Sequence, residues 1–270
     1  MSLRLAAACL AASLLNLGCA TQPLRSPVSF AVLEDEPRVR FEPGAEAYAR
    51  QVAALLPQAV AQVEAAHYLP FADLVMVHVC GSETCFAAHV TSRNVSGATV
   101  PDNQVFLAPR LFDRETQRLS MILAHELSHL HLGQRLGHYT HEVPVWFHEG
   151  LAALASGGGG ADYASEAEAR AAFAAGRAFS PATLDTPDHR HRAEDWGLSP
   201  HLFYRQAMMF LQYLKQESET RFREFLLRVQ DGENFTEAFG RTYNRSLLEA
   251  GQRFLEAVVP VAAAPAPPTD

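Results

Sequence analysis

The chain has 270 residues, of which 48% are hydrophobic, and its formal net charge is −8. This supply of apolar residues is enough for a full-sized core, which excludes a disordered regulator. The 22 basic residues are outnumbered by 30 acidic ones, so no basic surface for phosphates is expected and nucleic acid is disfavoured as a partner. The length predicts one domain of about 200–250 residues, or two small domains that share a cleft.

The first nineteen residues predict an export signal. Arg4 precedes an apolar run over residues 5–17, which is too short to span a bilayer as a helix and suits a signal-peptide core. Its end resembles bacterial lipoprotein signals, in which a cysteine after a small residue is lipidated. Cys19 is that cysteine here, although Asn16 stands where these signals usually have leucine. Ordinary cleavage with secretion and a buried N-terminal helix are the alternatives.

This resemblance implies a protein of the bacterial cell envelope, anchored in a membrane through lipid on Cys19. Ala20 lacks the aspartate that commonly retains such proteins at the inner membrane, which favours the outer membrane, facing the periplasm. Residues 20–43 contain four prolines and predict a tether with one short strand near residues 28–33.

Processing would leave two cysteines, Cys80 and Cys85. Two cysteines close in sequence suit a disulfide in an oxidising compartment, which agrees with export. A metal site is the alternative, but the CxxC spacing is absent and there is no second cysteine pair.

The part of the chain after the tether begins with mixed elements. Helical spacing of apolar residues predicts a helix over residues 45–67, which Pro57 should kink or split. Two short apolar runs, over residues 74–79 and 104–107, predict strands. A further strand or hairpin is expected near residues 86–91.

Most of the remaining chain has helical patterns. Residues 114–132 predict an amphipathic helix that Gly133 ends, and residues 145–155 predict a second helix, which ends in the flexible run at 156–160. Further helices are predicted over residues 161–175, 201–217, 220–229 and 246–259. The Pro- and Ala-rich residues 260–270 predict a disordered tail.

The sequence His-Glu-Leu-Ser-His occupies residues 125–129, inside the first of these helices. Histidines four apart on a helix differ by about 40° in direction, so His125 and His129 can bind one ion. Glu126 can reach a water on that ion and act as its general base. Zinc suits this chemistry because imidazole binds it and it is redox-inert. The alternative is a polar helix face with coincidental histidines.

Glu149 is the candidate third ligand. It follows His129 by twenty residues, enough for a loop and a reversal that brings an antiparallel helix alongside. A carboxylate in this apolar stretch would be costly to bury unless its charge were compensated, as zinc would do. Three protein ligands and one open position for water would make a catalytic zinc site.

The segments HELSH and WFHEGLA together resemble the gluzincins, zinc metallopeptidases of the thermolysin-like superfamily. They are more narrowly similar to small bacterial peptidases in which HExxH is followed by a WxxEGLA-type segment. The similarity covers residues 119–258, including LFYRQAMMFLQYL and a short acidic turn, DGENFTEAFG, before the last helix. It implies His125, His129 and Glu149 as ligands of one Zn²⁺ per chain and Glu126 as the catalytic base.

The order of these elements predicts an α+β fold, and the resemblance implies that this fold is zincin-like. A small mixed β-sheet would pack on helices in the part up to about residue 132, followed by a helical C-terminal half, within one domain over residues 44–259. The strand at 104–107 would run along the cleft and pair with extended substrate. The cysteine pair would brace the preceding loop near the cleft rim.

Gluzincins usually add a downstream Tyr or His that stabilises the oxyanion. Tyr204 is the first candidate for this role and His201 the next, and an ordinary packed tyrosine is the alternative reading of Tyr204. Helix geometry turns His131 about 200° from the second ligand histidine, so it should face away. His148 is expected either to support a ligand or to lie on the surface.

The resemblance implies a lipid-anchored zinc endopeptidase whose partner is a polypeptide substrate. One alternative is a non-catalytic, zinc-containing binding lipoprotein, against which the presence of Glu126 argues. Another is an amide hydrolase that acts on peptidoglycan crosslinks, which is the same reaction on a different substrate.

Overall fold

The computed structural model describes residues 30–259, except for residues 93, 101 and 187. The export signal with Cys19, the first part of the tether and the tail at 260–270 lie outside the described residues. Within the described part of the chain, no helix is long and apolar enough to cross a bilayer.

A five-stranded mixed sheet forms the N-terminal part, in the order β1-β2-β3-β5-β4. Its strands are β1 (Ala31–Val32), β2 (Val39–Phe41), β3 (Val77–Val79), β4 (Gly97–Val100) and β5 (Gln104–Leu107). The three inner strands are parallel, and the edge strands β1 and β4 pair antiparallel to their neighbours. Because β1 and β2 belong to the sheet, the folded part includes residues that the sequence assigned to the tether.

β5 is an inner strand. Its residues pair with β3 on one side and with β4 on the other. The prediction that residues 104–107 pair with substrate is therefore wrong, because both edges of the strand are already hydrogen-bonded. The free edge at this end of the sheet belongs to β4.

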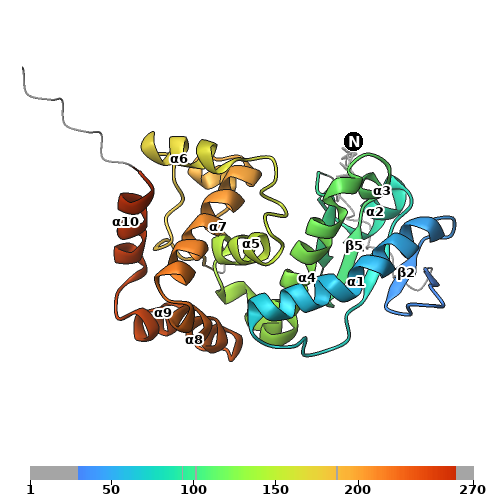
Figure 1. Cartoon of the computed structure of the whole chain (residues 1–270), viewed down its shortest axis with the longest axis horizontal. Coiled ribbons are helices and arrows are strands. Elements are labelled where there is room, and N and C mark those ends of the chain that lie inside the picture. Colours follow the sequence, from blue (N-terminus) through green and yellow to red (C-terminus); the bar gives the residue numbers. More distant parts are fainter. Residues whose placement is uncertain (1–29, 93, 101, 187, 260–270) are drawn as a thin grey trace, which may run out of the picture.

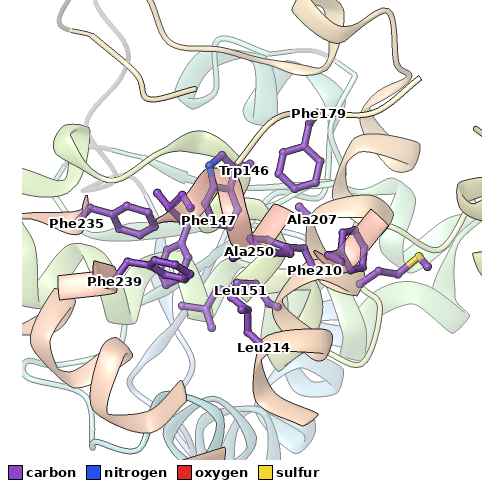
Figure 2. Packing of buried hydrophobic residues seen from close by; sticks show 14 of the residues in the cluster. Trp146, Phe147, Leu151, Phe179, Ala207, Phe210, Leu214, Phe235, Phe239 and Ala250 are labelled. Atoms are coloured by element: carbon purple, nitrogen blue, oxygen red, sulfur yellow. The ribbon is translucent and has the colours of Figure 1, made fainter. Parts of the chain in front are cut away.

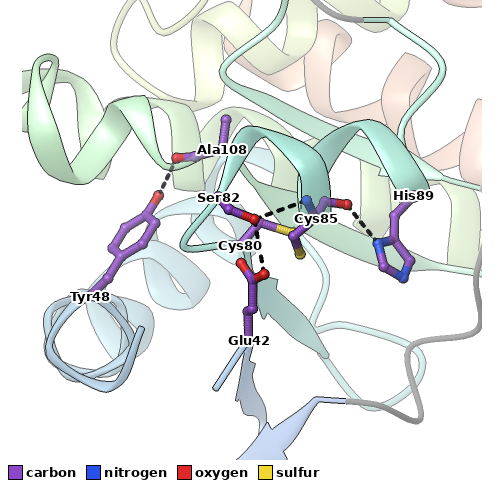
Figure 3. Close-up of a disulfide and its surroundings, with 7 residues drawn as sticks. All are labelled: Glu42, Tyr48, Cys80, Ser82, Cys85, His89 and Ala108. Carbon is purple, nitrogen blue, oxygen red and sulfur yellow. Dashed lines mark hydrogen bonds between the residues drawn. A yellow bond between two sulfur atoms is a disulfide. The ribbon is translucent and has the colours of Figure 1, made fainter. Parts of the chain in front are cut away.

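The segment between β3 and β4 is helical where a strand or hairpin was expected. It forms α2 (Glu83–His89), because Ser82 caps the helix by accepting a hydrogen bond of 3.1 Å from the Cys85 backbone. Cys80, at the end of β3, is joined to Cys85 by the predicted disulfide (Figure 3). Ser82 also donates a hydrogen bond of 2.9 Å to Glu42, so the disulfide and the cap together attach α2 to the sheet.

α1 (Glu46–His67) crosses the sheet as one helix and packs against α4 (Figure 1). Val52, Leu56 and Val63 are fully buried in this contact. Of the two predicted effects of Pro57, a kink or a split, the split is wrong. The proline lies on the exposed face of the single helix, where the carbonyl that it leaves unpaired can reach water.

The helix predicted at 114–132 is divided into three helical segments, which together extend from residue 110 to residue 136. It consists of α3 (Arg110–Asp113), η2 (Thr116–Arg118) and α4 (Leu119–Leu136). Gly133 lies inside α4 and does not end it. Its missing side chain makes room for the turn between β4 and β5, since a Cβ there would lie 3.0 Å from Asn103 Oδ1. The helix ends at Gly137, whose φ is +53°.

The C-terminal half is helical, as predicted. Its elements are η3 (Gly137–Glu142), α5 (Val145–Ala155), α6 (Glu166–Ala174), η4 (Ala193–Trp196), α7 (Pro200–Glu217), α8 (Glu219–Gln230), α9 (Phe235–Tyr243) and α10 (Leu247–Val258). The segment predicted to be a short acidic turn contains α9. Asn234 caps it by accepting hydrogen bonds from two backbone amides, and Phe235 and Phe239 are buried on its apolar face.

α5 lies at the centre of this half. Trp146 and Phe147 pack among aromatic residues of α7 and α9, including Phe210 and Phe235 (Figure 2). The helix also packs against α4 and α1, so it joins the helical half to the sheet-bearing part (Figure 1). This packing fixes the orientation of Glu149, which follows two residues after Phe147.

Candidate metal centre

Two histidines of α4 meet at the contact with α5. The Nε2 atoms of His125 and His129 lie 3.1 Å apart. On other faces of α4, Leu123, Leu127 and Leu130 are fully buried in the core formed with α1 and the sheet. The apolar stripe thus holds the helix in place and turns the two imidazoles toward α5.

Glu149 approaches both histidines from α5. Its Oε2 lies 3.3 Å from Nε2 of His125 and 3.6 Å from Nε2 of His129. Gly150 allows α7 to pack closely behind it, since a Cβ there would lie 2.9 Å from the backbone of Ala207. The structure therefore brings the three predicted ligand residues together, with ligand atoms within 4.8 Å of one another.

The donor set fits zinc. Nitrogen and oxygen ligands on a tetrahedral ion at about 2.0–2.1 Å lie about 3.3 Å apart. Nδ1 of His125 lies 2.9 Å from the carbonyl oxygen of Gly159, which can only accept. A His125 that binds a metal through Nε2 can donate its Nδ1 proton to this carbonyl, so the contact suits a ring whose Nε2 binds the ion beside His129 and Glu149.

The charges of the site are strongly coupled. Burial would raise the pKa of Glu149, but His129 and His125 outweigh burial and hold this pKa well below its ordinary value. For His129, burial would lower the pKa, but the carboxylates of Glu149 and Glu126 raise it above the ordinary value. A half-buried carboxylate between two imidazoles thus stabilises positive charge, which a divalent cation would supply.

Glu126 lies beside this group, under the edge strand of the sheet. Its carbonyl oxygen and its Oε2 lie 2.8 Å and 3.1 Å from Thr99 Oγ1 of β4. β4 approaches closely here, because a Cβ on Gly97 would lie 2.8 Å from Glu126 Cγ. The predicted base is therefore held by β4, and the sequence had not singled out Thr99.

Tyr204 of α7 also reaches the centre. Its ring is stacked on that of His125 at a centroid distance of 6.0 Å. The charge of Glu149 and burial raise the pKa of Tyr204 well above its ordinary value, so its phenol is protonated at neutral pH. His201, the second candidate for the oxyanion role, has Nδ1 2.5 Å from the carbonyl oxygen of Gly160.

Two further histidines near the centre have separate roles. His131 faces away from the centre, with Nε2 2.9 Å from the carbonyl oxygen of Leu69. His148 is buried, and its Nε2 lies 2.9 Å from the carbonyl oxygen of Thr140. Burial, with a contribution from His129, lowers the pKa of His148 to about 4.

The run at residues 156–160, predicted to be flexible, is packed against the ligand helix. A Cβ on Gly159 would lie 2.5 Å from the carbonyl oxygen of Met121. Gly160 has a φ of +77°, and a Cβ there would lie 2.8 Å from the ring of His125. Consecutive glycines allow such contact with a neighbouring backbone. The glycine run was therefore the signal in the sequence for the contact of Gly159 with α4, which was not predicted.

No protein-family model and no curated protein matches the chain. Among solved structures it is similar to native yeast LTA4 hydrolase, with 15% sequence identity and a TM-score of 0.52. The match covers 89% of this chain and 40% of the other, so the chain spans less than half the length of that protein. The likeness shows the fold, which is α+β and zincin-like, as predicted.

Proposed function

We propose that this protein is a zinc-dependent endopeptidase of the bacterial cell envelope. The observation that carries the proposal is the convergence of His125, His129 and Glu149, whose ligand atoms lie 3.1–3.6 Å apart. Glu126 adjoins them on α4. Structural zinc sites usually have four protein ligands, whereas three ligands beside a carboxylate base are typical of catalytic sites.

Each residue has a distinct part in the reaction. His125, His129 and Glu149 would bind one Zn²⁺, which polarises a carbonyl and lowers the pKa of a water when bound. Glu126 takes a proton from the attacking water and passes it to the leaving amine. Tyr204, protonated at neutral pH, donates a hydrogen bond to the oxyanion that develops on the substrate carbonyl.

The substrate is an extended polypeptide segment that pairs with β4. This strand is the edge of the sheet next to α4, and it contacts Glu126 through Thr99. Backbone pairing on a strand edge recognises peptides of varied sequence, because the hydrogen bonds come from the main chain.

The proposed location is the outer membrane, facing the periplasm, with a lipid anchor on Cys19. The signal-like N-terminus supports it, as does the disulfide between Cys80 and Cys85, which suits an oxidising compartment. Labelled fatty acid should be incorporated by the full chain in bacteria and not by Cys19→Ser. Secretion of the unaltered chain without label would contradict the anchor.

The proposed reaction is tested on the soluble form that starts after Cys19. We expect one zinc per chain and hydrolysis of a quenched peptide library, with hydrolysis lost in Glu126→Gln while zinc is retained. Absence of zinc in the unaltered protein would overturn the proposal. Zinc without turnover would favour a binding lipoprotein, and release of fragments from purified sacculi alone would favour peptidoglycan crosslinks as substrate.

A further inference from the structure

The segment over residues 156–164, here called the glycine loop, connects α5 to α6 and contacts the ligand helix on its way. Gly159 accepts the hydrogen bond from Nδ1 of His125, at 2.9 Å. The backbone of Gly158 bonds back to Ala153, at 2.8 Å. These contacts place one loop carbonyl against one ligand histidine.

A partly buried ion pair attaches the loop to α4. Arg118, at the N-terminus of α4, is 7% exposed and reaches both carboxylate oxygens of Asp162 in the loop, through Nε and through Nη2, the latter at 3.2 Å. Its guanidinium carbon also lies 4.5 Å from the ring centroid of Tyr163. Two parallel hydrogen bonds from a planar guanidinium fix both distance and direction.

Arg118 is itself held on the ligand-helix side. It bonds the carboxylate of Glu115, and its Nη1 lies 3.2 Å from Ser96 Oγ, just before β4. Arg118 therefore belongs to the same rigid unit as His125, whereas Asp162 belongs to the loop. The ion pair sets the position of Gly159, three residues before Asp162, relative to His125.

We propose that Arg118 and Asp162 are positioning residues for the metal centre. The ion pair holds the glycine loop so that the Gly159 carbonyl keeps the proton of His125 on Nδ1, which leaves Nε2 free to bind the ion. This inference rests on the proposed function. A loop that has moved away leaves the neutral imidazole free to place its proton on Nε2, and that tautomer cannot bind a metal through Nε2.

Asp162→Asn tests the proposal, because it keeps the size of the side chain and removes its charge. Loss of a partner that orients a ligand histidine typically costs about 10–100-fold in metal affinity, and we expect about 10-fold weaker zinc binding for this more remote change. The dissociation constant is measured on the soluble form by competition with a chromogenic chelator. Nitrogen-15 NMR of the zinc-loaded protein should show that the Nδ1–H of His125 loses its hydrogen bond to the Gly159 carbonyl.

Glu217→Gln is the matched control. Glu217 pairs with both terminal nitrogens of Arg245 in the helical half. The arginine side chains of the two ion pairs are similarly buried, at 6% exposed for Arg245 and 8% for Arg118. The Glu217→Gln variant should have a lower melting temperature but an unchanged zinc affinity. Arg118→Lys is the second test variant, because it keeps the charge but loses the paired hydrogen bonds. It replaces Asp162→Asn in the test if that variant does not fold.

Wild-type zinc affinity and an unchanged Nδ1–H signal of His125 in a folded Asp162→Asn or Arg118→Lys protein would overturn the positioning role. An equal loss of zinc affinity in Glu217→Gln would overturn it too, because the loss would then come from a general decrease in stability. Failure of the unaltered chain to bind zinc is a separate result, which would overturn the proposed function itself.

Discussion

Thr99 and Glu126 are joined through one hydroxyl group. Thr99 Oγ1 lies 2.8 Å from the carbonyl oxygen of Glu126 and 3.1 Å from its Oε2. The hydroxyl has a single proton to donate and two acceptors on the same residue, so it fixes the carboxylate relative to its own backbone. Because Thr99 belongs to the edge strand β4, the strand proposed to bind substrate also orients the proposed base.

Thr99→Val removes this hydroxyl at nearly constant volume. The Glu126 carboxylate then samples other rotamers. We expect kcat to fall about 10-fold, because a misplacement of a catalytic group by about 1 Å can lower the rate by up to about 100-fold. Zinc content should not change. Thr99→Ser restores the hydroxyl and should recover most of the lost kcat in the quenched-peptide assay. Wild-type kcat in Thr99→Val would contradict the orienting role.

Gly160→Ala should weaken zinc binding about 10-fold or more. The added Cβ would lie 2.8 Å from His125 Cε1 and 3.1 Å from Tyr204 Cδ2, so the ligand ring must move. Gly176→Ala is the control, because its φ of +71° is close to the +77° of Gly160 and nothing lies within 4 Å of its added Cβ. Both variants carry about 1 kcal/mol of backbone strain. Equal zinc affinity in the two would show that the contact with His125 does not matter.

Removal of zinc should lower the melting temperature. The ion would bind the folded chain at His125, His129 and Glu149, so at a thousandfold excess over its dissociation constant it stabilises by about 4 kcal/mol. Calorimetry of the soluble form with a chelator, and after zinc is added back, measures the shift. Glu149→Gln should abolish most of the shift. A melting temperature that is unaffected by the chelator would contradict a metal bound at this place.

His78 should make the fold sensitive to acid. Its ring is 2% exposed and stacks on Phe106, and burial, with a contribution from Arg40, lowers its pKa to about 4. The unfolded chain, with a histidine pKa of about 6.5, binds the proton more tightly, so stability is retained above pH 6.5 and falls as the pH drops toward 4. His89 of α2 and Arg40 of β2 face the same ring.

The loss between pH 7.5 and pH 4.5 amounts to about 2–3 kcal/mol for this group. His78→Phe should reduce the pH dependence of the urea unfolding free energy by that amount, with values at pH 7.5 serving as the reference. An identical pH dependence in the variant and the unaltered protein would mean that other groups cause the loss.

Several elements were readable from residue patterns. The apolar stripes of α5 and α7 predicted helices close to the observed ones, because a helical period is a local property of the chain. The helices α2 and α9 are among the elements that these patterns missed. α2 follows from its Ser82 cap, and α9 from the Asn234 cap and from Phe235 and Phe239, whose burial depends on α5 and α7. Short helices of this kind are stabilised by caps and tertiary packing more than by propensity.

The pairing of His125 with His129 was determined by sequence, because residues four apart on a helix share a face whatever surrounds them. Tertiary packing decided the rest. Glu149 meets the two histidines only because α5 packs on α4, and Gly159 reaches His125 across 34 residues because Arg118 holds the loop. The order of the strands, which no local pattern specifies, made β4 and not β5 the edge beside Glu126. Contacts between distant segments depend on burial shared by the whole core, which spacing along the chain does not encode.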